Sequence, residues 1–183
     1  MKKLIFTAST IFLINLFNAQ NTPVERNVTG VQIGLFGVDV YNETKLDDKW
    51  ALRSEGSLFS AVWGGDMYDK TGFALYPAIT LQPKYYYNIG KRAEAGKNTK
   101  HNSANYIGLQ VRYNPDWFVI SNAKNITVNN KLSFIPTFGI RRNFSDHFNY
   151  EFKAGLGYGT TLGVTPNTSG GVLDLSLKVG YDF

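Results

Sequence analysis

The chain has 183 residues, which suits a single domain, and its formal net charge is +5. It contains no cysteine, which excludes a disulfide framework and a thiolate metal site. No apolar run reaches the roughly 20 residues that a membrane-spanning helix needs. The aromatic fraction of 15% and the 18 glycines favour β-structure, because aromatic side chains suit a pleated surface and glycine suits tight turns and crowded barrel interiors.

The first residues have the organisation of a secretory signal peptide. Lys2 and Lys3 form a short basic region, the apolar stretch 4–17 follows, and small or polar residues around Ala19 suit cleavage. Cleavage near Ala19 removes two of the 19 basic residues and lowers the net charge from +5 to +3. A charge that small does not argue for a nucleic-acid partner. The alternative for this stretch is a buried N-terminal helix.

The rest of the chain alternates between apolar and polar residues with a period of two, which predicts antiparallel β-strands. In the first of these segments the apolar parity switches around 36–38, which predicts a β-bulge. The segment 117–120 is apolar on both faces and completes an even number of strands. The eight predicted strands are 28–41, 50–63, 73–82, 107–113, 117–120, 132–141, 148–159 and 173–183.

The connections between these strands sort into two sets when the chain direction alternates. The generally longer and more polar set is 42–49, 89–104, 122–130 and 161–170. The other set is 64–72, 114–116 and 143–146. Long loops on one rim and short turns on the other are typical of outer-membrane barrels, in which both termini lie on the periplasmic side.

The composition of the less apolar strand face distinguishes a membrane barrel from a soluble one such as a lipocalin. A soluble barrel presents many Lys and Glu residues to water, whereas this face is mostly small or uncharged polar residues with scattered charges. Such residues suit the crowded interior of an eight-stranded barrel. Aromatic residues near the strand ends would form interfacial girdles, the alternative being an ordinary aromatic core. The charges expected in the lumen are Arg53, Glu55, Arg112, Arg141, Glu151, Lys153, Asp174 and Lys178.

Four stretches carry a resemblance to a known group of proteins. They are PKYYYN at 83–88, GKNT at 96–99, NSANY at 102–106 and GIRRNF at 139–144. Together with the Ala-Gln that ends the signal, they resemble small outer-membrane β-barrel proteins of the Bacteroidetes, a largely uncharacterised group. The terminal Tyr181 and Phe183 resemble the signal that the barrel assembly machinery reads in outer-membrane proteins, which implies that machinery as a partner during biogenesis.

Candidate catalytic residues are few. His101 and His147 are the two histidines, and neither has a second ligand at metal spacing, so we expect no metal and no cofactor. The triplet 101–103 resembles the His-x-Ser of the lipid A deacylase barrel, which implies His101 as a base and Ser103 as a nucleophile facing the outer leaflet. No acidic residue can be assigned to orient the base, and we favour solvated loop positions for both histidines.

The segment 90–101 concentrates positive charge. If it lies above the outer leaflet, its cations could contact lipopolysaccharide phosphates through charge-assisted hydrogen bonds. The alternative is a solvated, flexible loop. The candidate lipopolysaccharide contacts are Lys91, Arg92, Lys97 and Lys100.

We therefore expect an all-β protein, an eight-stranded antiparallel up-and-down transmembrane β-barrel in an outer membrane, with both termini periplasmic and a lumen filled by side chains. The expected role is structural or surface-interacting, through extracellular loops. The alternative is a barrel that handles lipids or small molecules, as a narrow pore or a deacylase-like enzyme. The sequence names no extracellular partner. The predicted divisions are a signal peptide at 1–19, a short segment at 20–27 and the barrel at 28–183.

Overall fold

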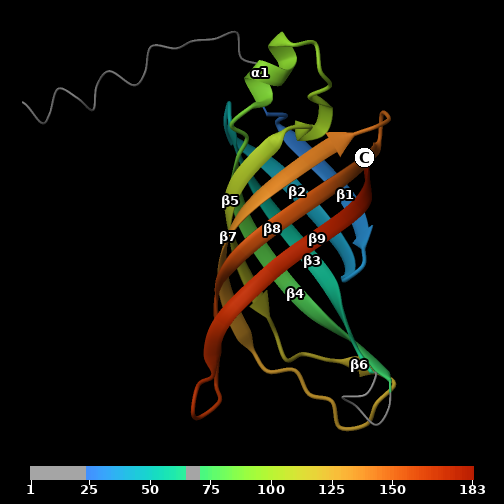
Figure 1. Ribbon diagram of the computed structural model, residues 1–183, viewed down its shortest axis with the longest axis vertical. Helices are drawn as coiled ribbons and strands as arrows, with labels where there is room; N and C mark the ends of the chain where they lie inside the picture. Colours follow the sequence, from blue (N-terminus) through green and yellow to red (C-terminus); the bar gives the residue numbers. More distant parts are fainter. Residues whose placement is uncertain (1–23, 65–70) are drawn as a thin grey trace, which may run out of the picture.

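The computed structural model describes residues 24–64 and 71–183, and the predicted signal peptide lies outside them. Figure 1 shows a cylinder of tilted strands with a short helix over one end. The strands are β1 Asn27–Gly34, β2 Gly37–Asp47, β3 Trp50–Trp63, β4 Gly72–Tyr85, β5 Asn105–Asn114, β6 Ile120–Ser121, β7 Lys131–Asn143, β8 Phe148–Thr161 and β9 Ser169–Asp182. Helix α1 spans Ile89–Glu94, and a 3₁₀-helix spans Lys100–Asn102. In the described ranges, no helix has the length and hydropathy to cross a membrane.

Eight of these strands close into a ring. Each long strand pairs antiparallel with the next one along the chain, and β9 pairs with β1 to complete the circle in the order β1-β2-β3-β4-β5-β7-β8-β9. The two-residue strand β6 lies outside the ring and pairs only with the β4 positions Ala74 and Leu75. The predicted fold class, an all-β barrel of eight antiparallel strands, is confirmed by this pairing.

The first predicted strand, 28–41, is instead a hairpin. β1 and β2 pair from Asn27↔Thr44 to Gly34↔Gly37, with a turn at 35–36 where the sequence predicted a bulge. Gly37 has a φ of +135°, and a Cβ at this position would lie 2.1 Å from the carbonyl oxygen of Leu58. Glycine is therefore required where β2 leaves the turn. The switch of the apolar residues from one strand face to the other at 36–38 therefore reflects a turn, at which the chain reverses direction.

The predicted strand 117–120 is also wrong. Only Ile120 and Ser121 form a short strand, and the rest of 115–130 runs outside the ring. The predicted total of eight ring strands was right because two errors cancelled. The prediction merged β1 and β2 into one strand, and it counted 117–120 as a strand of the ring.

The missed hairpin reversed the predicted direction of 50–63, 73–82 and 107–113, and the extra strand at 117–120 restored it for the strands that follow. In the structure the β2–β3 turn, the segment 86–104 and the β7–β8 turn lie at the same end as Val24, the first described residue, and the C-terminus (Figure 1). The Val24 N–H donates to the Asp48 carbonyl at 2.9 Å, and the Asp182 N–H to that of His147 at 2.8 Å. We call this the terminal end. The β1–β2 turn, the end of β3, the start of β4, and the β5–β7 and β8–β9 connections form the opposite end.

The two faces of the strands alternate as predicted. On β9, Leu173, Leu175 and Leu177 are at least half exposed on the outside, whereas Asp174 and Asp182 are buried inside. This strand pairs with β8 on one side and with β1 on the other, which was the expected position of the closing strand.

Substitution of Gly139 by valine tests the packing of the lumen. A Cβ at Gly139 would lie 2.1 Å from Cζ of Tyr106, which is fully buried. We expect G139V to lower the free energy of unfolding by about 1–3 kcal/mol, measured as the urea midpoint in lipid vesicles. The control is G170V on β9, where an added Cβ meets nothing within 4 Å. Equal midpoints for the two variants would contradict this packing.

Candidate functional site

The lumen of the barrel collects the charged side chains. All eight charges that the sequence placed there lie on inward-facing strand positions, buried or nearly so. Lys84 and Asp182 continue the same parity along β4 and β9 and could have been added from the sequence. Asp39 could not, because it lies in the part of β2 that was predicted as the end of a bulged strand. Glu43 could not, because it lies in the predicted connection 42–49. The structure thus adds four lumen charges: Asp39, Glu43, Lys84 and Asp182.

Glu151 on β8 lies at the centre of this cluster. Its carboxylate accepts hydrogen bonds from Lys84 Nζ at 3.0 Å, from Arg53 Nη1 at 3.2 Å and from Arg141 Nη1 at 3.3 Å. The hydroxyl of Tyr106 also donates to it. One carboxylate therefore joins cations from three different strands, β3, β4 and β7.

Glu43 on β2 forms the second centre. It accepts from Lys84 Nζ at 2.7 Å, from the Tyr86 hydroxyl at 2.6 Å and from Asn102 Nδ2 at 3.0 Å. Tyr86 follows the end of β4, and burial, reinforced by the Glu43 charge, raises its pKa well above the ordinary value. The hydroxyl therefore keeps its proton and remains a donor to Glu43.

Asp182 forms a third centre near the C-terminus. Arg141 Nη2 donates to both of its carboxylate oxygens, at 2.7 and 2.8 Å, and Asn143 Nδ2 donates at 3.1 Å. The Tyr41 hydroxyl donates to the same carboxylate. Because Arg141 also bonds Glu151, the clusters around Glu151 and Asp182 are continuous.

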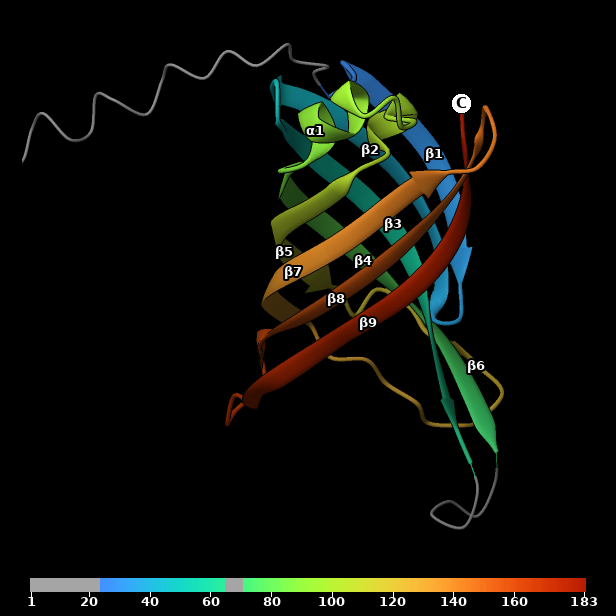
Figure 2. The ribbon, with the colours of Figure 1, turned by 45° about the horizontal axis from the view of Figure 1, so that its top comes forward.

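The segment 86–104 closes the barrel above these clusters. α1 and the 3₁₀-helix cover the terminal end in Figure 2. Three residues of this segment join Val24 and two strand residues in a cluster of fully buried side chains: Val24, Ala51, Tyr86, Ile89, Ala104 and Tyr106. The lumen is thus filled by paired charges and capped by apolar packing at this end.

A second, smaller charge group lies toward the opposite end. Arg112 Nη2 donates to Asp174 at 2.9 Å, and Lys153 Nζ lies 3.5 Å from the same carboxylate. Lys178 pairs with Asp39 and lies 3.6 Å from Glu55. A pocket of about 350 Å³ adjoins this group and opens through the barrel wall.

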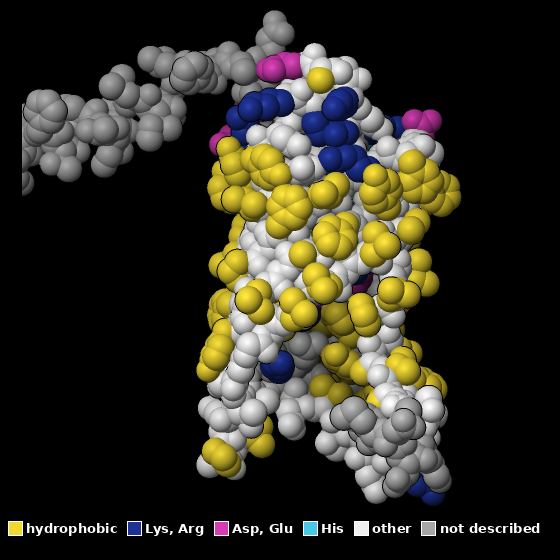
Figure 3. All heavy atoms as spheres, viewed as in Figure 1, with side chains coloured by type: hydrophobic (Ala, Val, Ile, Leu, Met, Phe, Trp, Pro, Cys, Tyr) yellow, Lys and Arg dark blue, Asp and Glu magenta, His cyan; other side chains and the backbone are white. Residues whose placement is uncertain are grey.

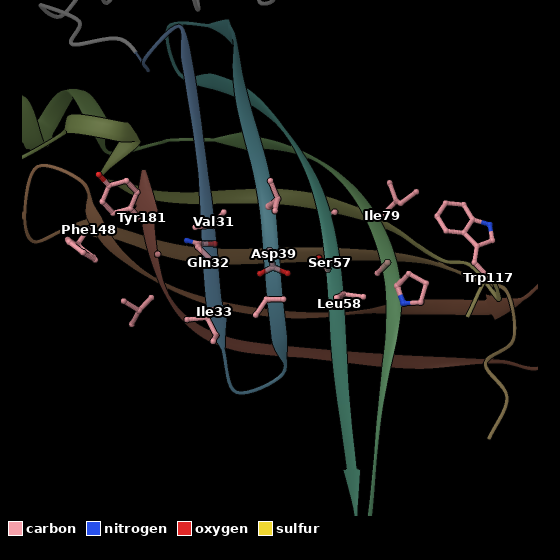
Figure 4. Close-up of a pocket in the computed structure, with 17 residues that line it drawn as sticks. Val31, Gln32, Ile33, Asp39, Ser57, Leu58, Ile79, Trp117, Phe148 and Tyr181 are labelled. Atoms are coloured by element: carbon pink, nitrogen blue, oxygen red, sulfur yellow. The ribbon is translucent and has the colours of Figure 1, made fainter. Parts of the chain in front are cut away.

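The outer face of β1 to β4 carries an apolar hollow of about 720 Å³. In Figure 4, Val31, Ile33, Leu58 and Ile79 lie along its floor, with Trp117 at one end. Phe148 and Tyr181 lie at the other end of the hollow in the same view. Such a surface suits hydrocarbon chains.

The structure does not join His101 and Ser103 into a catalytic pair. His101 Nδ1 lies 3.2 Å from Asp182 Oδ2, and the Ser103 hydroxyl accepts from the Asn143 N–H at 3.2 Å. No hydrogen bond links the two side chains within the described residues. The prediction of a solvated loop position is wrong for His101, which is buried, whereas His147 is exposed and stacks on Tyr181 at 5.1 Å. Across residues 24–64 and 71–183, no group of acidic residues and histidines could hold a metal ion.

The predicted lipopolysaccharide contacts lie at the terminal end. Lys91, Lys97 and Lys100 are exposed there, while Arg92 donates to the carbonyls of Ser103 at 2.8 Å and Asn98 at 2.9 Å. Figure 3 shows Lys and Arg side chains gathered beyond a belt of hydrophobic ones at this end. The sequence placed these cations and the termini on opposite sides of the membrane. The structure places them together, so the two expectations exclude each other.

Comparisons with known proteins give one similarity to report. No family model matches the sequence, and no curated protein matches it. Among solved structures, the chain is similar to Ail, the attachment invasion locus protein of Yersinia pestis, crystallised in complex with the heparin analogue sucrose octasulfate. The two are 12% identical over 87% of this chain and 100% of that chain, with a TM-score of 0.42. The fold assignment therefore rests on the strand pairing of this chain itself.

Substitution of Glu151 by glutamine tests the ion-pair cluster. Glutamine keeps the shape but removes the charge that Lys84, Arg53 and Arg141 share. Because three buried cations then lose a partner, we expect the free energy of unfolding in lipid vesicles to fall by about 3–5 kcal/mol. The control is K97Q, at an exposed position in the 86–104 segment. An E151Q protein as stable as K97Q would show that the cluster does not stabilise the barrel.

Proposed function

We propose that this chain is an integral β-barrel of a Gram-negative outer membrane, of the Bacteroidetes type, with a lumen closed to diffusion. The proposal rests on one observation: apolar side chains cover the outside of the barrel, and charged side chains are buried inside it. Leu156, Leu173 and Ile33 are 71%, 68% and 63% exposed, while Arg141 and Glu43 are 0% exposed. A water-soluble monomer rarely presents so extensive an apolar surface, whereas hydrocarbon requires one.

Aromatic residues at the terminal end support a membrane boundary there. Trp50 and Tyr85 pack with their ring centroids 5.0 Å apart on the outer face. Phe148, Tyr181 and Phe183 form a second group, with centroids 5.3 and 5.6 Å from Tyr181. Aromatic rings at this position would lie at the level of the lipid headgroups, where Tyr181 and Phe183 would serve as the signal for the barrel assembly machinery.

In the proposed orientation both termini are periplasmic, following cleavage of the signal peptide. The β5–β7 and β8–β9 connections then face outward, among the lipopolysaccharide. Lys91, Arg92, Lys97 and Lys100 face the periplasm, so a lipopolysaccharide contact through them is not retained. The role that this arrangement supports is structural, or the binding of a surface partner by the β5–β7 and β8–β9 connections.

A deacylase activity is not supported, because His101 and Ser103 bond to different partners. A pore is not supported either. The clusters around Glu151, Glu43 and Asp182 fill the terminal half of the lumen, and the segment 86–104 covers them.

The first prediction from this proposal concerns insertion and conductance. We expect the unboiled protein to migrate differently from the boiled protein on a detergent gel, because a closed barrel resists unfolding by the detergent. Protein that passes this check should give no stepwise conductance in a planar lipid bilayer. Absence of the mobility shift would contradict the membrane barrel, and regular conductance steps would contradict the closed lumen.

A second prediction concerns orientation. The chain has no cysteine, so a single introduced thiol can be labelled without background. We expect N167C, in the β8–β9 connection, to react with a membrane-impermeant maleimide on intact cells. E94C, at the exposed end of α1, should react only after the outer membrane is permeabilised. The reverse pattern would overturn the periplasmic placement of the termini.

A further inference from the structure

The wall of the barrel is incomplete on one side. The β1–β2 hairpin turns at 35–36, and in Figures 1 and 2 it ends well before its neighbours β3 and β9. Within the described residues, β9 pairs with β1 only through Lys178 to Asp182, and its positions 169–177 pair with β8 alone. Likewise 61–63 of β3 pair with β4 alone. The two strand edges therefore border an opening below the hairpin turn.

A pocket of about 350 Å³ lies in this opening. Figure 3 shows the molecule hollowed at this level, below its middle. The outer rim of the pocket is apolar and exposed, with Leu35, Phe36, Leu173 and Leu175 between 50% and 82% accessible. In the proposed membrane orientation, this rim faces the bilayer.

The floor of the pocket carries more positive than negative charge. Arg112 at 2.9 Å and Lys153 at 3.5 Å share the single carboxylate of Asp174. Lys178 also lines the pocket, but Asp39 and Glu55 pair with it. The three cations and three carboxylates of this group balance, but two of the carboxylates lie at Lys178 and one serves both Arg112 and Lys153.

Arg112 is also incompletely bonded. Its Nε is buried and has no hydrogen-bond partner among the described residues. The guanidinium lies 4.5 Å from the ring centroid of Phe59, which holds its plane against the β3 side of the pocket. An arginine fixed by an aromatic ring, with a donor unused, is suited to receive a carboxylate.

We propose that the opening admits a single-chain anionic amphiphile, a fatty acid, from the membrane. Its carboxylate binds Arg112 and Lys153, and its chain leaves across Leu35, Phe36, Leu173 and Leu175 into the bilayer. The pocket volume is near the lower limit of about 300 Å³ for small-molecule sites, which favours a compact headgroup with one chain. A second copy of the barrel is a poorer occupant, because a strand added at these edges pairs with backbone groups and leaves the Nε of Arg112 without a partner.

The unpaired edges of β3 and β9 are consistent with this occupant. Backbone N–H and C=O groups exposed to hydrocarbon are costly, and such edges persist where they border water or polar groups. A carboxylate and its hydration at the opening supply that polar environment. The inference depends on the proposed membrane insertion, because the amphiphile enters from the bilayer.

The experiment measures palmitate binding to the full mature barrel in lipid nanodiscs by calorimetry, with hexadecanol as the uncharged probe of equal chain length. We expect 1:1 binding of palmitate and an affinity about tenfold lower for hexadecanol and for the R112Q variant, because each loses a charge-assisted hydrogen bond. The matched control K97Q, at the other end of the barrel, should bind palmitate like the unchanged protein. Equal affinities for palmitate and hexadecanol, or an unaffected R112Q, would overturn the proposal.

Two further measurements separate the possible failures. S176W places an indole in the pocket lining without removing a charge, so it should abolish palmitate binding while the gel mobility shift is retained. If the mobility shift itself is absent, membrane insertion fails and the proposed function fails with it. If the barrel inserts as a dimer and binds no palmitate, the opening is an interface between copies. This result overturns the fatty-acid site and leaves the proposed function in place.

Discussion

The carboxylate of Glu151 contacts cations from three strands, and the rest of the barrel depends on that interaction. A ring of eight strands leaves an interior just wide enough for side chains, and in this chain those side chains are charged. A buried charge without a partner costs several kcal/mol. The ring therefore closes only in a register that brings Glu151, Glu43 and Asp182 against Arg53, Lys84 and Arg141.

The length of one hairpin divides the lumen into two halves. On the terminal side all eight strands contribute to the wall, and the segment 86–104 covers the filled interior. On the other side the β1–β2 turn at 35–36 leaves β3 and β9 without a common neighbour. One barrel is therefore sealed along its axis and open at its side, an arrangement that suits a molecule arriving from the lipid better than one crossing the membrane.

Much of the lumen was predictable from the alternation of the strands. Asp174 and Lys178 are separated by an even number of positions on β9, so one inward residue identifies the others. The prediction failed at Phe36 and Gly37, because a hairpin turn and a bulge both switch the parity of a strand. It failed again at 117–120, where an apolar run lies outside the ring. Because strand direction follows from strand count, the missed hairpin turn by itself placed the basic segment 89–104 at the end opposite the C-terminus, and the extra strand at 117–120 corrected the direction of the later strands.

The sequence by itself determined which side chains face in and which face out, because Cβ atoms alternate along any extended strand whatever its neighbours are. The number of strands was predicted correctly only because two errors cancelled. Only the tertiary structure decided which charges meet. Arg53 and Glu151 are 98 residues apart, and their contact follows from the closure of the ring. The side opening also depends on closure of the ring. The short β1–β2 hairpin leaves a gap between β3 and β9 because ring closure makes these two strands its neighbours.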